Sequence, residues 1–128
     1  MLAQGILALL ISAASLRPGV ECGQDYFELG LRSYRQDEHR EAFEAFEKLL
    51  ERDPEHIEGN YHLAMSLQKL GSLQQARTAF DRMLRIEPEH LAANYNLALL
   101  LAKLGEQEAS RAQLARLAPA KSANGWTR

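Results

Sequence analysis

The chain has little of what builds a reactive or cross-linked site. It contains one cysteine, Cys22, and a single thiol cannot form an internal disulfide framework. No histidine has a second histidine or a cysteine three or four residues away, as a helical metal pair requires. No serine lies in a G-x-S-x-G context, and no glycine-rich phosphate loop is present. The sequence therefore predicts no catalytic residue, no metal site and no cofactor, and we do not expect an enzyme.

Neither sign of charge dominates the composition. The 128 residues carry a formal net charge of −2, which is too close to neutral to indicate a nucleic-acid partner. The hydrophobic share of 46% is ordinary for one globular domain, and Gly and Pro are scarce, which favours helices. The charge is unevenly spread, because residues 24–56 carry ten acids and five bases whereas residues 91–128 carry two acids and five bases. One end of the chain is therefore acidic and the other basic.

Residues 1–16 differ from the rest of the chain. Residues 5–16 carry no charge, are too few to span a bilayer, which takes about 20 apolar residues, and suit the core of a secretory signal. The residues before them include no Lys or Arg, so the signal is weak. We expect export to the periplasm or the outside. The alternatives are an uncleaved signal that tethers the protein to a membrane, and an apolar N-terminal helix that packs on the rest of a cytoplasmic protein.

Residues 17–22 are interpreted as a linker. Arg17, Pro18 and Gly19 interrupt any helix. Cys22 follows Glu21, and an acidic neighbour does not fit a lipid-attachment site. Cys22 is therefore either an idle linker residue or, in an exported protein, a thiol available for an intermolecular bridge.

Beyond residue 22 the chain repeats itself at an offset of 34 residues, which separates Pro54 from Pro88. Residues 57–71 and 91–105 are related by this offset and are identical at eight of fifteen positions. Three units follow from it, with boundaries at residues 23–56, 57–90 and 91–122, and residues 123–128 remain as a tail. A fixed period of this length is typical of arrays of small helical units.

Each unit contains two helical patterns. In the second unit, apolar residues between 61 and 70 recur at spacings of three and four, and Gly71 is placed to end that helix. A second apolar stripe follows over residues 76–84, and Pro88 ends it. Neither stripe can be buried by one unit alone, so the units must stack. The sequence predicts an all-α solenoid of about six antiparallel helices, preceded by the short apolar N-terminal segment.

The repeated positions resemble those of the tetratricopeptide repeat family. Counted from each unit's first residue, the family has a large and then a small residue at 7 and 8, a small residue at 20, a large ring or aliphatic at 24 and proline at 32. The matching residues are Leu29-Gly30, Leu63-Ala64 and Leu97-Ala98, then Ala42, Ala76 and Ser110, then Phe46, Phe80 and Leu114, and finally Pro54 and Pro88. The matches cover about four fifths of the chain, and the resemblance implies a module that binds other proteins.

The third unit departs from the family's pattern. Pro119 comes three residues early, so we expect the last helix to end near Ala118. No full capping helix of the kind that such arrays usually carry follows it. The tail is too short to supply one, and Trp126 either folds back over Leu114 and Leu117 or is exposed.

The resemblance also implies a binding surface, because the first helices of such units line a concave groove that receives peptides. Positions 5, 9 and 13 of each unit would line that groove. The residues there are Phe27, Tyr61 and Tyr95, then Leu31, Met65 and Leu99, and then Arg35, Lys69 and Lys103. An apolar strip edged by cations fits a segment with hydrophobic anchors and acidic residues or a C-terminal carboxylate. The aromatics at position 5 have packing as their alternative role.

The family's clamp for acidic chaperone C-termini is not preserved. Where the clamp has Lys, Asn and further basic residues, this chain has Phe27, Leu31, His62, Ala92 and Asn96. Docking of a chaperone through that clamp is therefore not expected.

The leading functional hypothesis is an adaptor or assembly factor that holds a protein segment in the groove. The alternative is a structural module that stacks head to tail through uncapped, oppositely charged ends and so self-associates weakly. Contact with a membrane is expected only through an uncleaved N-terminal segment. The histidines are interpreted as solvated or turn residues: His56 and His90 in the Pro-Glu-His turns, His39 in the turn between two helices, and His62 on a first helix.

Overall fold

Residues 23–117 are described by the structure, which is a computed structural model, and they contain helices and turns but no strand. The predicted all-α array is confirmed. The predicted N-terminal segment (1–16), the linker (17–22) with Cys22, and the tail (123–128) lie outside the described residues, so these assignments stay predictions. The helices are α2 (Gly23–Arg35), α3 (His39–Arg52), α4 (Ile57–Lys69), α5 (Leu73–Ile86), α6 (Leu91–Lys103) and α7 (Gln107–Ala115).

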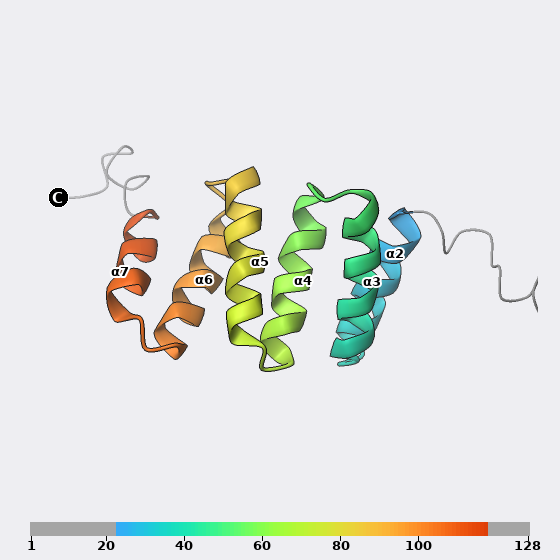
Figure 1. Cartoon of the computed structure of the whole chain (residues 1–128), viewed down its shortest axis with the longest axis horizontal. Coiled ribbons are helices and arrows are strands. Elements are labelled where there is room, and N and C mark those ends of the chain that lie inside the picture. The colour runs from blue at the N-terminus through green and yellow to red at the C-terminus, as the bar shows by residue number, and fades with distance from the viewer. Residues whose placement is uncertain (1–22, 118–128) are drawn as a thin grey trace, which may run out of the picture.

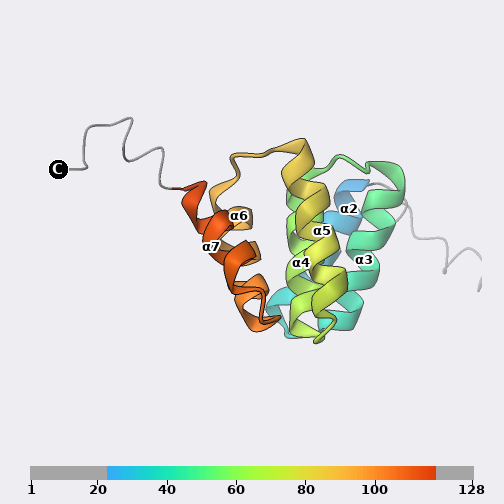
Figure 2. The ribbon, with the colours of Figure 1, turned by 60° about the vertical axis from the view of Figure 1, so that its left-hand side comes forward.

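The six helices follow one another along the long axis of the molecule, each antiparallel to the next (Figure 1). The connections within a unit lie at one edge of the array, and the connections between units lie at the other. Figure 1 shows α3 in front of α2, and Figure 2 shows α5 in front of α4 and α7 in front of α6, so second helices form one layer and first helices the other. The first helices α2 and α4 also contact each other directly. This layering gives the array one face made by α2, α4 and α6.

The turn inside each unit is closed by a residue with positive φ. Gly71 and Gly105 have φ of 82°, a conformation that glycine adopts without a steric cost. The backbone N–H of the residue after each glycine donates to the carbonyl five residues earlier, at 2.9 Å in both turns. Asp37 occupies the same position in the first unit with φ of 60°. The sequence prediction that Gly71 ends its helix is confirmed.

The turn between units is held by a repeated set of polar contacts. Nδ2 of Asn60 donates to the carbonyl oxygens of Pro54 and His56, at 2.9 Å each. The backbone N–H of Gly59 donates to Nδ1 of His56 at 2.9 Å, so this histidine caps α4. The same bonds recur one unit later around His90. These two histidines are therefore structural caps, a role that the sequence interpretation as solvated turn residues missed.

The core lies where the second helix of one unit meets both first helices around it. Phe46 and Phe80 at position 24 are fully buried. Gly30 explains how the first ring fits, because a Cβ at this residue would lie 2.6 Å from Cε1 of Phe46. The small residues of the family pattern thus make room for the rings.

The third unit ends differently from the first two. Helix α7 has 9 residues, whereas α3 and α5 have 14 each. It ends at Ala115 and not near Ala118, because the last N–H groups turn back to carbonyls three residues earlier, at Gln113 and Leu114. Leu114 holds the position of the buried rings, yet its exposed fraction is 42%.

Within residues 23–117, no helix is both long enough and apolar enough to cross a membrane.

Candidate functional site

The nine predicted groove residues lie on the three first helices. Within α2, α4 and α6, positions 5, 9 and 13 are four residues apart and therefore fall on one helix side. Because the first helices form one layer of the array, the three sets are related along a single face. The structure therefore brings the predicted residues onto the same face of the molecule.

The apolar residues of this face are unequally exposed. Phe27, Leu31, Tyr61 and Met65 are partly buried and pack against the core. On α6, by contrast, Tyr95 is 51% exposed and Leu99 is 42% exposed. The accessible apolar surface is thus concentrated on the third unit, although the sequence alone made the three units look equivalent.

The two partly buried aromatics at position 5 pack inside their own units, against the ring at position 24 and the histidine that ends the unit. The ring of Phe27 lies 5.0 Å from the ring of the capping His56 and 6.3 Å from Phe46. One unit further on, the ring of Tyr61 lies 5.5 Å from His90 and 6.2 Å from Phe80. Packing is therefore a real part of what these residues do.

His62 lies in an aromatic cluster between the first two units, so its interpretation as a solvated residue is wrong. Its ring stacks on Phe46 at 5.6 Å and meets the rings of Phe27, Tyr34 and Tyr61 at 6.3, 5.9 and 5.2 Å. Its buried Nδ1 has no hydrogen-bond partner among the described residues. Only the position beside Tyr61 in the repeat pointed to this location.

Burial is the main cause that lowers the pKa of His62 below the ordinary histidine value. The nearby carboxylate of Glu58 opposes this shift, and the guanidinium of Arg35 reinforces it. Burial also raises the pKa of Tyr34 and of Tyr61. The cluster is consequently uncharged at neutral pH, so it adds no charge to the middle of the face near the first two units.

At the next junction the residue in the place of His62 is Asn96. Its Nδ2 donates to the hydroxyl oxygen of Tyr61 at 2.9 Å and to the carbonyl oxygen of Ala92 at 2.9 Å. The hydroxyl of Tyr61 is thereby tied to the following unit. A substitution at Tyr61 would remove an inter-unit contact as well as groove surface.

One rim of the face is basic. Arg35, Lys69 and Lys103 are exposed at the C-terminal ends of the first helices, where the helix dipole favours cations. None of the three forms an ion pair within residues 23–117. Near the opposite ends of the same helices the charge is acidic, with Glu28 on α2 and Glu58 on α4. The face therefore has a basic rim, an apolar middle and an acidic side.

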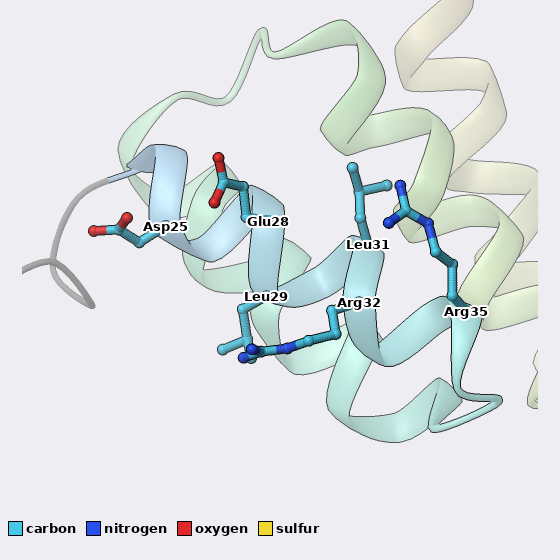
Figure 3. Close-up of a pocket in the computed structure, with 6 residues that line it drawn as sticks. All are labelled: Asp25, Glu28, Leu29, Leu31, Arg32 and Arg35. Carbon is cyan, nitrogen blue, oxygen red and sulfur yellow. The ribbon is translucent and has the colours of Figure 1, made fainter.

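A hollow of ≈ 500 Å³ runs along α2 at the end of the array (Figure 3). Leu31 and Arg35 lie together on one side of the helix, and Leu29 and Arg32 lie on the opposite side. Every described residue that lines this hollow belongs to α2. It is an open helix surface that continues the groove face through Leu31 and Arg35, and not an enclosed site.

Position 3 of the first helices bears on the head-to-tail alternative, because it faces the preceding unit. A Cβ on Gly59 would lie 2.7 Å from Cδ2 of Leu49 in the preceding unit, and Ala93 at the same position is fully buried. In α2 this position is Asp25. A preceding unit stacked as the internal units stack would therefore bury a carboxylate in a space that fits only a small residue.

Position 10 leads to the same conclusion. Ser66 and Leu100 are fully buried in the later units, whereas α2 has the exposed Arg32 at this position. The first helix carries both signs of charge, so the end of the array is not simply acidic. Head-to-tail stacking in the geometry of the internal junctions is therefore not favoured.

No group of three or more His, Cys, Asp or Glu side chains in the described part of the chain could hold a metal ion. His39 is the first residue of α3 and lies against the ring of Tyr34 at 5.4 Å, and so is not a turn residue. His56 and His90 cap helices, and His39 and His62 pack against aromatic rings.

Two family models, both described as tetratricopeptide repeat, match the chain over residues 61–125 and 33–84. No sequence among curated proteins matches it. The two matched ranges cover parts of all three units. They agree with the repeat positions that the sequence suggested.

Solved structures of similar fold include a crystal structure of MamA, with a TM-score of 0.77, 16% identity, and coverage of 84% of this chain and 63% of that one. MamA 41-end from Desulfovibrio magneticus RS-1 has a TM-score of 0.73, 25% identity, and coverage of 79% and 57%. The TPR2B-domain:pHsp70-complex of yeast Sti1 has a TM-score of 0.63, 19% identity, and coverage of 81% and 89%. The chain thus spans less than two thirds of these MamA chains.

The fold is that of a protein–protein interaction module, and proteins built on it generally act as non-enzymatic scaffolds. Three stacked helix–turn–helix units and the matches to the family models together identify the chain. It belongs to the tetratricopeptide repeat family.

Proposed function

We propose that the chain is an adaptor or assembly factor that binds a protein segment on the face made by α2, α4 and α6. The observation that carries this proposal is the pair of exposed apolar side chains on α6, Tyr95 and Leu99. Both follow packed counterparts in register on α4, so they continue an apolar strip into solvent. Large aromatic and aliphatic groups of this kind are typical anchors of binding surfaces.

The basic rim indicates what flanks the apolar anchors of the partner. Arg35, Lys69 and Lys103 lie in register along one edge and have no acidic partner among the described residues. A segment with hydrophobic side chains and carboxylates placed toward this rim would complement them. Such exposed pairs contribute more to specificity and association rate than to affinity.

The likeness to the yeast Sti1 structure supports the size of the proposed site. That structure is a complex of a single repeat domain, and this chain covers 89% of it. A surface made by three units is therefore large enough for a ligand. The ligand here should differ, because Phe27 and Leu31 replace polar clamp residues and make the first unit apolar.

A selection from a random peptide library against the full chain tests the proposal. We expect enriched peptides to combine hydrophobic anchors with Asp or Glu. The variant Tyr95→Ser/Leu99→Glu should lose at least tenfold in affinity, as expected for hot-spot residues. Both side chains are exposed, so the variant should keep the helicity of the parent. The matched control is Gln74→Glu, which adds one negative charge at an exposed site on α5.

Unchanged affinity of the selected peptides for Tyr95→Ser/Leu99→Glu would overturn the proposed surface. Enrichment of basic peptides would instead overturn the proposed chemistry of the partner. The variant Lys69→Gln/Lys103→Gln separates the two, because it should weaken binding at low salt and have little effect at high salt.

Export is proposed together with this function. The uncharged residues 5–16 support it. N-terminal sequencing of the protein purified from its source cells tests it. A mature chain that begins near residue 16 is expected, and a chain that retains residues 5–16 in the soluble cytoplasmic fraction would contradict it.

A further inference from the structure

A second hollow lies between α3 and α5, in the layer of the second helices. Phe43 and Glu47 of α3 form one wall, Arg82 of α5 belongs to the other, and Leu63 and Leu67 of α4 form the floor. Its volume is ≈ 260 Å³. An adjoining hollow of ≈ 250 Å³ shares Glu47, Leu63 and Arg82 with it and extends to Glu51. Together they make one continuous depression, which we call the α3/α5 furrow.

Half of the furrow recurs at the next junction. The hollow between α5 and α7 is lined by Asp81, Leu84, Arg85, Leu97, Gln113 and Arg116. Each of these residues is the repeat equivalent of a residue that lines the α3/α5 furrow, so the two hollows correspond. This recurrence shows that the repeat geometry itself produces the depression.

The rest of the furrow does not recur, because the second junction has an ion pair, here called the clasp, that the first junction lacks. Nη1 of Arg77 on α5 lies 2.6 Å from Oε1 of Glu106, the residue before α7. At the equivalent positions of the first junction the chain has Phe43 and Ser72. A charged pair therefore spans one junction, whereas an aromatic ring borders the open furrow at the other.

The furrow has an apolar end and a charged end. Phe43, partly buried, lies over the buried Leu63 and Leu67. Glu47 and Glu51 are exposed on α3, and neither forms an ion pair within the described residues. Of the described residues that line the opposite wall, Arg82 is the single cation. The net charge of the lining is negative, so a cation is the complementary group.

We propose that the α3/α5 furrow binds a basic amphipathic helix of a partner protein. A large apolar side chain of that helix occupies the end lined by Phe43, Leu63 and Leu67, and a following Lys or Arg reaches Glu47 and Glu51. The charge of the lining supports this occupant, because Glu47 and Glu51 outnumber Arg82 among the described residues that line the furrow. A helix fits the space between two neighbouring helices by the packing of ridges into grooves.

This site goes beyond the proposed groove, since it lies in the other layer and selects the opposite charge. A chain that holds an acidic segment on α2, α4 and α6 and a basic helix between α3 and α5 would bridge two partners. The contact is small, so we expect weak binding, with a dissociation constant on the order of 100 µM.

The test uses the full chain and two synthetic helical peptides of about 16 residues, long enough to be partly helical alone. Both peptides carry leucines four residues apart. One carries lysines three residues after each leucine, and the other carries glutamates there. Amide chemical shifts should change over residues 43–51 and 75–82 with the lysine peptide. The glutamate peptide should bind at least tenfold more weakly.

The decisive variant copies the chain's own clasp. Phe43→Arg/Ser72→Glu places at the first junction the pair that the second already has. Ser72 makes no side-chain cap bond, so its replacement removes none. This variant should keep its helicity and lose at least tenfold in affinity for the lysine peptide. If it fails to fold, Glu47→Gln/Glu51→Gln, which changes only exposed groups, should show the same loss.

The proposal is overturned if the two peptides bind equally, if the shifts map to α2, α4 and α6, or if the closing variants bind as the parent does. Tyr95→Ser/Leu99→Glu should bind the lysine peptide as the parent does, so a failure of the groove and a failure of the furrow are distinguishable.

Discussion

The turns inside the units allow one physical cause to be isolated by mutation. Gly71 and Gly105 have φ of 82°, and a Cβ added to either would meet no atom within 4 Å. Alanine there introduces backbone strain and no clash. The left-handed conformation costs a non-glycine residue about 1–2 kcal/mol, and the lower entropy of the unfolded chain offsets about 0.4–1 kcal/mol of this. We therefore expect Gly71→Ala and Gly105→Ala each to lower the free energy of unfolding by about 1 kcal/mol.

The first unit provides the reciprocal experiment. Asp37 holds the same place with φ of 60°, so Asp37→Gly should relieve strain. Its gain should be smaller, about 0.5 kcal/mol, because Asp tolerates this conformation better than Ala and glycine adds entropy to the unfolded state. The side chain of Asp37 is 91% exposed, and its Oδ1 lies 3.6 Å from Nε2 of His39. Its removal therefore costs little stabilising interaction.

Urea unfolding followed by circular dichroism at 222 nm measures these changes, with the m-value as a check that compactness is unaltered. For a domain of this size, 1 kcal/mol shifts the melting temperature by about 4–8 °C. Gly71→Asn is the control, because Asn adopts positive φ more readily and should lose less than Ala. A neutral Gly71→Ala, or an Asp37→Gly that destabilises the protein, would refute the reasoning.

Three further predictions concern the packing between units. Because burial lowers the pKa of His62, the unfolded chain takes up a proton at a higher pH than the folded chain does. The contribution of His62 to the free energy of unfolding is therefore complete above about pH 6.5 and falls as the pH approaches the lower folded pKa. His62→Asn should reduce this loss of stability in acid, and an unchanged pH dependence would contradict the prediction. Phe80→Ala should lower the free energy of unfolding by about 3–5 kcal/mol. Leu114→Ala should lower it by about 1 kcal/mol, since Leu114 is 42% exposed. Equal losses in urea unfolding would contradict the exposure of Leu114 at the end of the array. A double-mutant cycle on Arg77 and Glu106 should give about 0.5–1 kcal/mol at low salt, and a coupling that persists in 1 M salt would contradict its partly exposed setting.

The places where helices end could be predicted because they are encoded locally. Gly71 and Pro88 end helices through their own backbone preferences, and the stripe that contains Phe80 follows the helical period. The fixed offset between units then repeats each conclusion in the next unit. Family resemblance placed the groove residues on α2, α4 and α6 in the same way.

The exposure of equivalent residues could not be predicted, because it depends on the neighbouring unit. Tyr61 and Tyr95 hold the same position, yet Tyr61 is covered by His90 at the end of its own unit and by Asn96 of the following unit, whereas Tyr95 has no described unit beyond its own. His62 is apolar in its surroundings for the same reason, since the rings around it come from three different helices. A sequence pattern states which residues repeat, and exposure depends on what lies against each copy.

The α3/α5 furrow was missed for a related reason. Phe43 and Ser72 are ordinary as single residues. They become informative only when the Arg77–Glu106 contact shows what the same two positions do one unit later. Comparison of the three units in space, and not along the sequence, identifies such differences.

Amide chemical-shift mapping of a library-selected peptide on the full chain tests the central claim most directly. The claim is that the face made by the first helices binds the partner. Perturbed amides should cluster on α2, α4 and α6, with the largest changes around Tyr95 and Leu99, and the changes should shrink as salt screens Lys69 and Lys103. Perturbations confined to α3, α5 and α7, or to the two ends of the array, would contradict it.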